Sequence, residues 1–222
     1  MDFIWHICQA IGVGAAAGLS PAVGLSMLIV CAAVGLGITT ANDDYDFLES
    51  AAAVVVAVLV LLQSVALIAI PGGMAARVAA DRPRLTAIHL ALAILFGALA
   101  GGIVFGAESD PTWIGLLFGG TSAALVAYAS GGLLRGVGER LEASQQRQMK
   151  KANKEEREAA KKDVESSRRV IAFAVDVFAV VAVIVPLLLP PTGVILPIAA
   201  AVLIVRGRRR AEKKHEGLRV LN

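Results

Sequence analysis

Polar side chains that could carry chemistry are few in the apolar segments of this chain. Asp176 is the only acid inside a predicted membrane span, and a charged group in hydrocarbon usually faces other helices or water. Gln63 and Ser64 lie midway through another apolar segment, where they favour hydrogen bonds to a solute or to a neighbouring helix. His89 lies one turn inside a further predicted helix, and histidine is the side chain whose ordinary pKa lies nearest to neutral pH. We take these four as candidates for a solute pathway; the alternative for Asp176 is a shallow site paired with Arg169 or with another arginine of the inner face.

Two predicted helix starts, Ser20-Pro21 and Asp110-Pro111, add further candidates. Ser and Asp cap helices and Pro suits the first turn, while Gly18 favours a left-handed end of the preceding helix. The N–H groups and positive dipole end of a helix start can receive an anion. If the two starts meet near the middle of the membrane, they line a path for a small polar or anionic solute. The alternative is an interfacial turn satisfied by water.

No residue pattern in the chain is typical of catalysis. The sequence has no nucleophile and base at a recognisable spacing, no paired intramembrane carboxylates, no phosphate-binding loop and no His-Glu zinc helix. The three His residues do not have metal-ligand spacing. We therefore predict that the protein is not an enzyme and has no metal or cofactor.

The composition is typical of a helical membrane protein. The chain has 222 residues with 57% hydrophobic content and a mean hydropathy of +0.72, which is too apolar for a soluble domain of this size. All 21 Lys and Arg fall in three places, at 77–84, at 135–169 and from Arg206 onward. Because these blocks border apolar spans, they indicate cytoplasmic segments of a bacterial inner membrane protein and not a nucleic-acid surface. The C-terminus is then cytoplasmic.

The apolar segments predict an all-α, polytopic architecture. The run from Phe3 to Ile38 has 36 residues without Lys, Arg, Asp or Glu, and as one helix it would be about 54 Å long against a hydrocarbon core of roughly 30 Å. We predict a broken or re-entrant pair there, and six or seven membrane helices in total, depending on how that pair is counted. The predicted units are a membrane bundle at 1–137, a charged cytoplasmic arm at 138–169, a transmembrane hairpin at 170–206 and a basic tail at 207–222.

Small residues recur in a pattern that suggests an internal repeat. Gly14 to Gly18 before Ser20-Pro21 resembles Gly97 to Gly101 before Asp110-Pro111. If the unit is three helices, the second copy is inverted relative to the first, an arrangement found in transporters; the alternative is chance recurrence. Spacings of four residues between glycines also allow close helix packing. The glycines assigned to packing are Gly14, Gly18, Gly97, Gly101, Gly115 and Gly119.

The stretch 138–169 changes character completely, to ten basic and seven acidic residues. Pairs such as Glu165 and Arg169 lie one helical turn apart. We predict one solvated helix, about 48 Å long if continuous, with an apolar stripe too thin for a coiled coil. Two alternatives add a role for this arm, namely docking of a cytoplasmic protein or contact with anionic lipid.

The order of Gly18-Leu19-Ser20-Pro21, Ile70-Pro71, Gly119-Gly120 and Asp176 resembles a bacterial membrane family known as domain of unknown function family 4126. The resemblance covers roughly residues 11–209. It implies an uncharacterised multi-span membrane protein. The chain departs from the family pattern in having Gln63 where an acid is expected, Ala127 and Tyr128 where a His is expected, and a longer arm.

The sequence favours two functions and ranks a third, a membrane enzyme acting on lipid, below them. The first is a small channel or transporter-like protein, embedded in the lipid bilayer, that passes a small polar or anionic solute. The second is a non-transporting scaffold that recruits a partner through the charged arm. Either form is compatible with a homo-oligomer.

Overall fold

A computed structural model describes residues 2–37, 50–69, 83–107, 111–149 and 154–219. Every secondary-structure element within these ranges is helical, which confirms the predicted all-α class. Four of the helices are long and apolar enough to cross a membrane, and three shorter apolar helices accompany them. The structure is therefore that of a membrane protein by helix length and composition.

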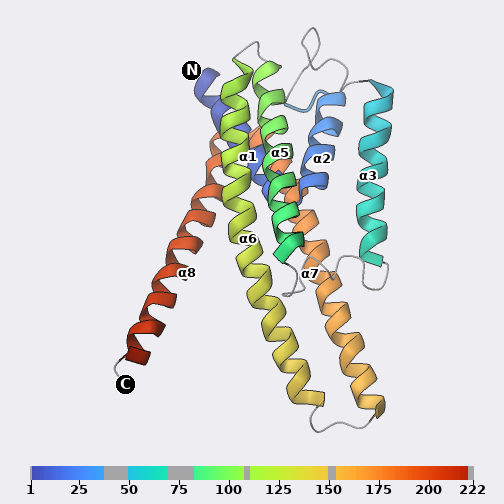
Figure 1. Cartoon of the computed structure of the whole chain (residues 1–222). Coiled ribbons are helices and arrows are strands. Elements are labelled where there is room, and N and C mark those ends of the chain that lie inside the picture. The colour runs from blue at the N-terminus through green and yellow to red at the C-terminus, as the bar shows by residue number, and fades with distance from the viewer. Residues whose placement is uncertain (1, 38–49, 70–82, 108–110, 150–153, 220–222) are drawn as a thin grey trace.

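The first three helices occupy the upper part of the molecule, and α1 and α3 begin at its upper end (Figure 1). α1 (Asp2–Leu19) descends from the upper end to the middle, and α2 (Pro21–Ala33) returns from there to the upper end. α3 (Ala51–Ala69) then descends at the periphery. The two ends of the α1–α2 pair thus lie at the same end of the molecule, and the junction between them lies inside the bundle.

The remaining helices are longer and alternate in direction (Figure 1). α5 (Pro83–Gly106) rises beside α1, and α6 (Thr112–Met149) descends past the end of the bundle. α7 (Lys154–Leu188) returns beside α6, a short 3-10 helix η2 (Pro190–Val194) follows, and α8 (Ile195–Arg219) descends to the C-terminus. The predicted basic tail is thus helical as far as Arg219.

The contact of α1, α5 and α6 is made by backbones that approach closely. A Cβ atom added at Gly14 would lie 2.6 Å from the Cα of Gly119, and one at Gly18 would lie 2.6 Å from the carbonyl oxygen of Ala123. One added at Gly101 would lie 2.9 Å from the Cα of Gly119. No side chain fits at these points, so the close approach of the three helices requires glycine. All six glycines that the sequence assigns to packing lie at this contact, namely Gly14, Gly18, Gly97, Gly101, Gly115 and Gly119.

Gly18 does not end α1 in a left-handed conformation, as its position before the break suggested. α1 continues to Leu19, and the described glycines with positive φ are Gly35 and Gly37. Gly18 is helical, and its missing Cβ admits the backbone of α6. The chain turns at the next polar residue instead, where proline restricts the residue before it to an extended conformation.

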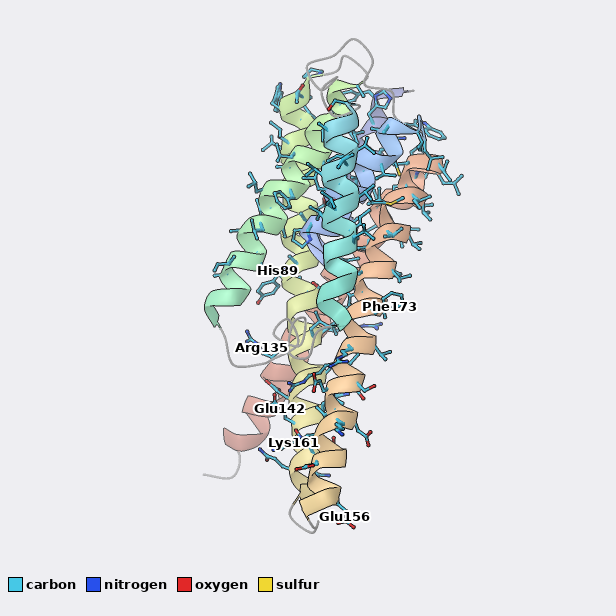
Figure 2. The ribbon with its side chains drawn as sticks, turned by 90° about the vertical axis from the view of Figure 1, so that its right-hand side faces the viewer. His89, Arg135, Glu142, Glu156, Lys161 and Phe173 are labelled. Carbon is cyan, nitrogen blue, oxygen red and sulfur yellow. The ribbon has the colours of Figure 1, made fainter. Side chains whose placement is uncertain are left out.

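The charged arm is a hairpin and not the single helix of about 48 Å that we predicted. The lower part of α6 and the first part of α7 run side by side beyond the bundle, as Figure 2 shows for Glu142 on one helix and Lys161 and Glu156 on the other. Arg168 of α7 donates a hydrogen bond to Glu142 of α6 at 2.7 Å, which ties the two helices together. The arm is therefore about half as long as a continuous helix.

Candidate functional site

The interruption between α1 and α2 is confined to Ser20. The backbone of Ser20 is extended, with φ −145° and ψ 96°, and Pro21 follows at the first position of α2. The N–H of Ser20 still donates to the carbonyl of Ala16 at 3.1 Å, and the carbonyl of Ser20 accepts from the N–H of Gly24 at 2.8 Å. The break at this position is confirmed, although the Ser20 side chain makes no capping hydrogen bond. The turn therefore follows from the backbone before proline and not from a side-chain cap.

The α1–α2 hairpin closes tightly above this turn. A Cβ atom added at Gly24 would lie 2.8 Å from the backbone N of Ala17 and 2.9 Å from its Cα. Ser20 is fully buried, and Pro21 is buried beside it. The tip of the hairpin is therefore enclosed by other helices instead of being exposed at either end of the bundle.

Asp176 lies on α7 and is only 7% exposed. Its height follows from a fixed contact, because the side-chain amide of Gln9 on α1 donates to the carbonyl of Leu187 on α7 at 3.2 Å. α1 descends from Gln9, and Ser20 follows Gln9 by 11 residues. α7 rises to Leu187, and Asp176 precedes Leu187 by 11 residues (Figure 1). Both lie about 16 Å below that contact, at 1.5 Å per residue. The buried acid and the tip of the hairpin are thus at the same depth.

Arg169, one of the predicted partners of Asp176, is paired within the arm. Arg169 donates to Glu165 one turn away, at 2.8 Å, and its neighbour Arg168 donates to Glu142. Both guanidinium groups thus have carboxylate partners in the arm. Asp176 lies further into the apolar part of α7, within the span that ends at Leu188.

Gln9 is a buried polar residue that sequence reasoning missed. It is 9% exposed, and its bond to Leu187 joins residues 178 positions apart in the chain. The carbonyl of Leu187 belongs to the last turn of α7, where carbonyls have no partner within their own helix. A polar side chain in an otherwise apolar run of the first helix was the available signal.

Of the other pathway candidates, only His89 has a described side chain. His89 is half-buried on α5, toward the lower part of that helix in Figure 2. Gln63 and Ser64 lie in α3, but their side chains are outside the described part of the structure, as is Asp110. Among the described candidates, only Ser20, Pro21 and Asp176 are buried at one depth.

The hypothesis that the two helix starts meet is wrong. α1 and α6 descend together, with Gly14 against Gly119. Ser20 lies six residues below Gly14, whereas Thr112, where α6 begins, lies seven residues above Gly119. At 1.5 Å per residue the two starts are about 20 Å apart along the bundle. The start of α6 is at the upper end, so only the start of α2 lies inside.

An apolar groove of about 200 Å³ opens elsewhere, where α7, η2 and α8 meet over α1. It includes none of the pathway candidates, and its walls are mainly aliphatic. The residues that line it include Gly12, Phe178, Val181, Val185, Thr192 and Leu196. This groove does not provide a path for a polar solute.

Comparisons with known proteins add no identification. No known family model, curated protein or solved structure matches the chain. Within the described ranges no three His, Cys, Asp or Glu side chains are grouped so as to hold a metal ion.

Proposed function

We propose that this protein is a small membrane transport protein whose solute path passes the tip of the α1–α2 hairpin. The supporting observation is the common depth of two buried polar residues, Ser20 at the hairpin tip and Asp176 on α7. Interrupted helices inside a membrane protein expose backbone groups that only a partner or a cavity can satisfy. Buried acids in spans commonly mark ion or substrate pathways. Both features occur here together.

The proposed topology is a re-entrant hairpin and five crossings. α2 has 13 residues, so it is about 20 Å long and too short to cross a core of roughly 30 Å. α3, α5, α6, α7 and α8 then cross in alternate directions, giving six membrane elements, the lower of the two predicted counts. Within the described ranges, Lys and Arg occur only in the lower parts of α5, α6, α7 and α8 (Figure 1), which supports a cytoplasmic arm, a cytoplasmic C-terminus and an external N-terminus in an inner membrane.

The inverted repeat remains part of this proposal. α1, α2 and α3 run down, up and down, whereas α5, α6 and α7 run up, down and up (Figure 1). These opposite directions support a pair of inverted three-helix units. The units are unequal in length, since α2 has 13 residues and α6 has 38. The resemblance to domain of unknown function family 4126 also stays a prediction, one that bears on architecture and not on the solute.

The buried acid narrows the class of solute. A carboxylate at the depth of the hairpin tip would attract a cation or a hydrogen-bond donor and would repel an anion. A small neutral or cationic polar solute therefore fits Asp176 better than the anionic solute that the helix start alone suggested.

Flux measurements on purified protein in liposomes test the proposal. We expect the wild type to pass at least one solute of a panel of small polar molecules and monovalent cations. Asp176→Asn should lower that flux at least tenfold, while Asp163→Asn should leave it unchanged because Asp163 is exposed on the arm of the same helix. Ser20→Ala should also lower the flux, compared with Ser144→Ala on the arm. An absence of flux for the whole panel in correctly folded wild-type protein contradicts the proposal.

The scaffold is a second candidate because the arm hairpin extends beyond the membrane helices. Its described side chains are largely exposed, and Glu142–Arg168 fixes its two helices to each other. Deleting residues 145–162 separates the two functions. A transport protein should retain its flux, whereas a scaffold should lose a partner captured from cytoplasmic extract by the intact chain.

A further inference from the structure

Asp176 lies on the face of α7 that packs against the α1–α2 hairpin. Its neighbours along this face are buried, namely Ala172, Ala179, Val183 and Leu187. At about 100° per residue, Val183 and Leu187 each lie within about 20° of Asp176 round the helix. Both belong to the hydrophobic core that α7 forms with α1 and α2. The carboxylate therefore faces the hairpin, at the depth of its tip.

The last turn of α1 presents oxygen atoms on the side of that carboxylate. The bond from Gln9 to α7 marks the side of α1 that faces α7, and Ser20 lies within about 20° of Gln9 round the helix. Pro21 has no N–H, so the carbonyl of Ala17 cannot form its helical hydrogen bond. Within the described ranges no backbone N–H donates to the carbonyls of Ala17 or Leu19. Carbonyls at the C-terminal end of a helix point along its axis, here toward the tip.

The charge at the tip favours a single positive charge. The carbonyl end of α1 and the N–H end of α2 meet there, and their dipole charges, roughly half a unit each and of opposite sign, offset each other. Asp176 is the only acid in the membrane-spanning parts of the described helices. No cluster of three acidic, His or Cys side chains occurs within the described ranges. One carboxylate balances a monovalent cation, whereas a divalent cation would leave a positive charge in the apolar interior.

We propose that a monovalent metal cation, Na⁺ or K⁺, binds at the hairpin tip between Asp176 of α7 and the end of α1. The carboxylate supplies the charge, and the hydroxyl of Ser20 and the carbonyls of Ala17 and Leu19 supply neutral oxygen ligands, which hard cations prefer. A hydroxyl that donates its hydrogen elsewhere keeps lone pairs for a cation. Carbonyls at the ends of interrupted helices coordinate Na⁺ in transporters. The inference rests on the proposed solute path and names the ion that the path accepts.

Binding of radioactive Na⁺ and Rb⁺, the latter in place of K⁺, to the purified full chain in detergent tests the site. We expect saturable binding of one ion per chain at up to about 0.15 M salt. Asp176→Asn, which keeps the shape of the side chain, should weaken the affinity at least tenfold. Asp163→Asn is the matched control on the same helix, and its affinity should equal that of the wild type because Asp163 is exposed on the arm.

A second variant tests the carbonyl ligands. Pro21→Ala returns an N–H to the position from which it can donate to the carbonyl of Ala17. Since that carbonyl is then withdrawn from the ion, the affinity should fall about fivefold, the equivalent of one hydrogen bond. Pro111→Ala, at an exposed position before α6, should leave the affinity unchanged.

Binding is measured without flux, so the site and the proposed function fail separately. The site is overturned if folded wild-type protein binds neither ion, if Asp176→Asn binds as tightly as the wild type, or if Ca²⁺ binds more tightly than both monovalent ions. If Asp176→Asn does not fold, Asp176→Glu should change the ratio of the Na⁺ and Rb⁺ affinities, and an unchanged ratio contradicts the site. Cation binding through Asp176 without flux of any solute would support the site and contradict the transport function.

Discussion

The upper and lower halves of the protein hold their helices together by different means. In the upper half, α1, α5 and α6 contact one another through glycine backbones, without charged side chains at the contact. In the lower half, α6 and α7 form the arm hairpin, where Arg168 and Glu142 join the helices. In lipid, apolar side chains gain little by leaving one apolar neighbour for another, so close backbone packing decides which helices associate. In water, ion pairs and partial burial of side chains can also decide which helices associate.

The two kinds of contact differ in how well they tolerate amino-acid substitutions. A contact between backbones has no side chain that can adjust, whereas an ion pair between long side chains can rearrange or be replaced by water. The hairpin tip that we assign to solute passage is attached to the rigid half, since Gly14 and Gly18 lie on α1 just before Ser20. The tip is therefore held in place by the part of the molecule that tolerates the least variation.

The largest expected effect is that of Gly119→Ala. Its Cβ atom would lie 2.9 Å from the Cα of Gly101 and would also meet the carbonyl of Gly97, so α5 and α6 must separate. We expect a loss of about 3 kcal/mol in the free energy of unfolding, at the upper end of measured overpacking costs. Unfolding of the purified protein in mixed micelles, followed by circular dichroism, measures it.

Gly132→Ala on the same helix is the control for that variant. Nothing lies within 4 Å of a Cβ atom at Gly132, so the substitution only reduces the backbone freedom of the unfolded chain. We expect unchanged or increased stability, by up to about 1 kcal/mol. If both variants lose the same free energy of unfolding, close glycine packing is not what holds the helices of the upper half together.

A smaller effect is expected from Gln9→Met, which keeps the length of the side chain but removes its donor. The carbonyl of Leu187 then loses the hydrogen bond from Nε2 of Gln9. We expect a loss of about 1 kcal/mol, as for other hydrogen bonds between helices in membranes. Gln146→Met, at an exposed position of the arm, should leave the free energy of unfolding unchanged. If both variants lose the same free energy of unfolding, the hydrogen bond of Gln9 does not align α1 with α7.

Local rules predicted the break in the chain, but contacts between distant segments could not be predicted. The residue before proline is restricted wherever it occurs, so Ser20 could be identified from four residues of sequence. Gly18 was assigned both to a helix end and to a helix contact, and only the contact is present, because the two kinds of glycine look identical in sequence. Gln9 was missed because its partner is 178 residues away, and no periodicity connects the two.

The arm was predicted as one helix for a similar reason. Residues 139–169 contain no Gly or Pro, and opposite charges recur at helical spacing, so every local signal favoured continuation. Two helices form instead because α6 and α7 pack against each other at the base of the arm, where Gly138 and Ala172 are buried. Tertiary packing thus decided the architecture of a segment whose helix propensity is uniform.

The smallest expected effect is that of Glu142→Gln in the arm. Arg168 would keep its position but lose the charged partner on α6, and the side chains are 19% and 45% exposed, so water offsets much of the loss. We expect a change of about 0.5 kcal/mol in the stability of the arm, measured by amide hydrogen exchange of 139–147, that disappears at high salt. Glu139→Gln, on an exposed position of the same helix, should have no such salt-dependent effect. A loss from Glu142→Gln as large as that from Gly119→Ala would mean that the arm is packed as rigidly as the glycine contact, and the contrast between the two halves would fail.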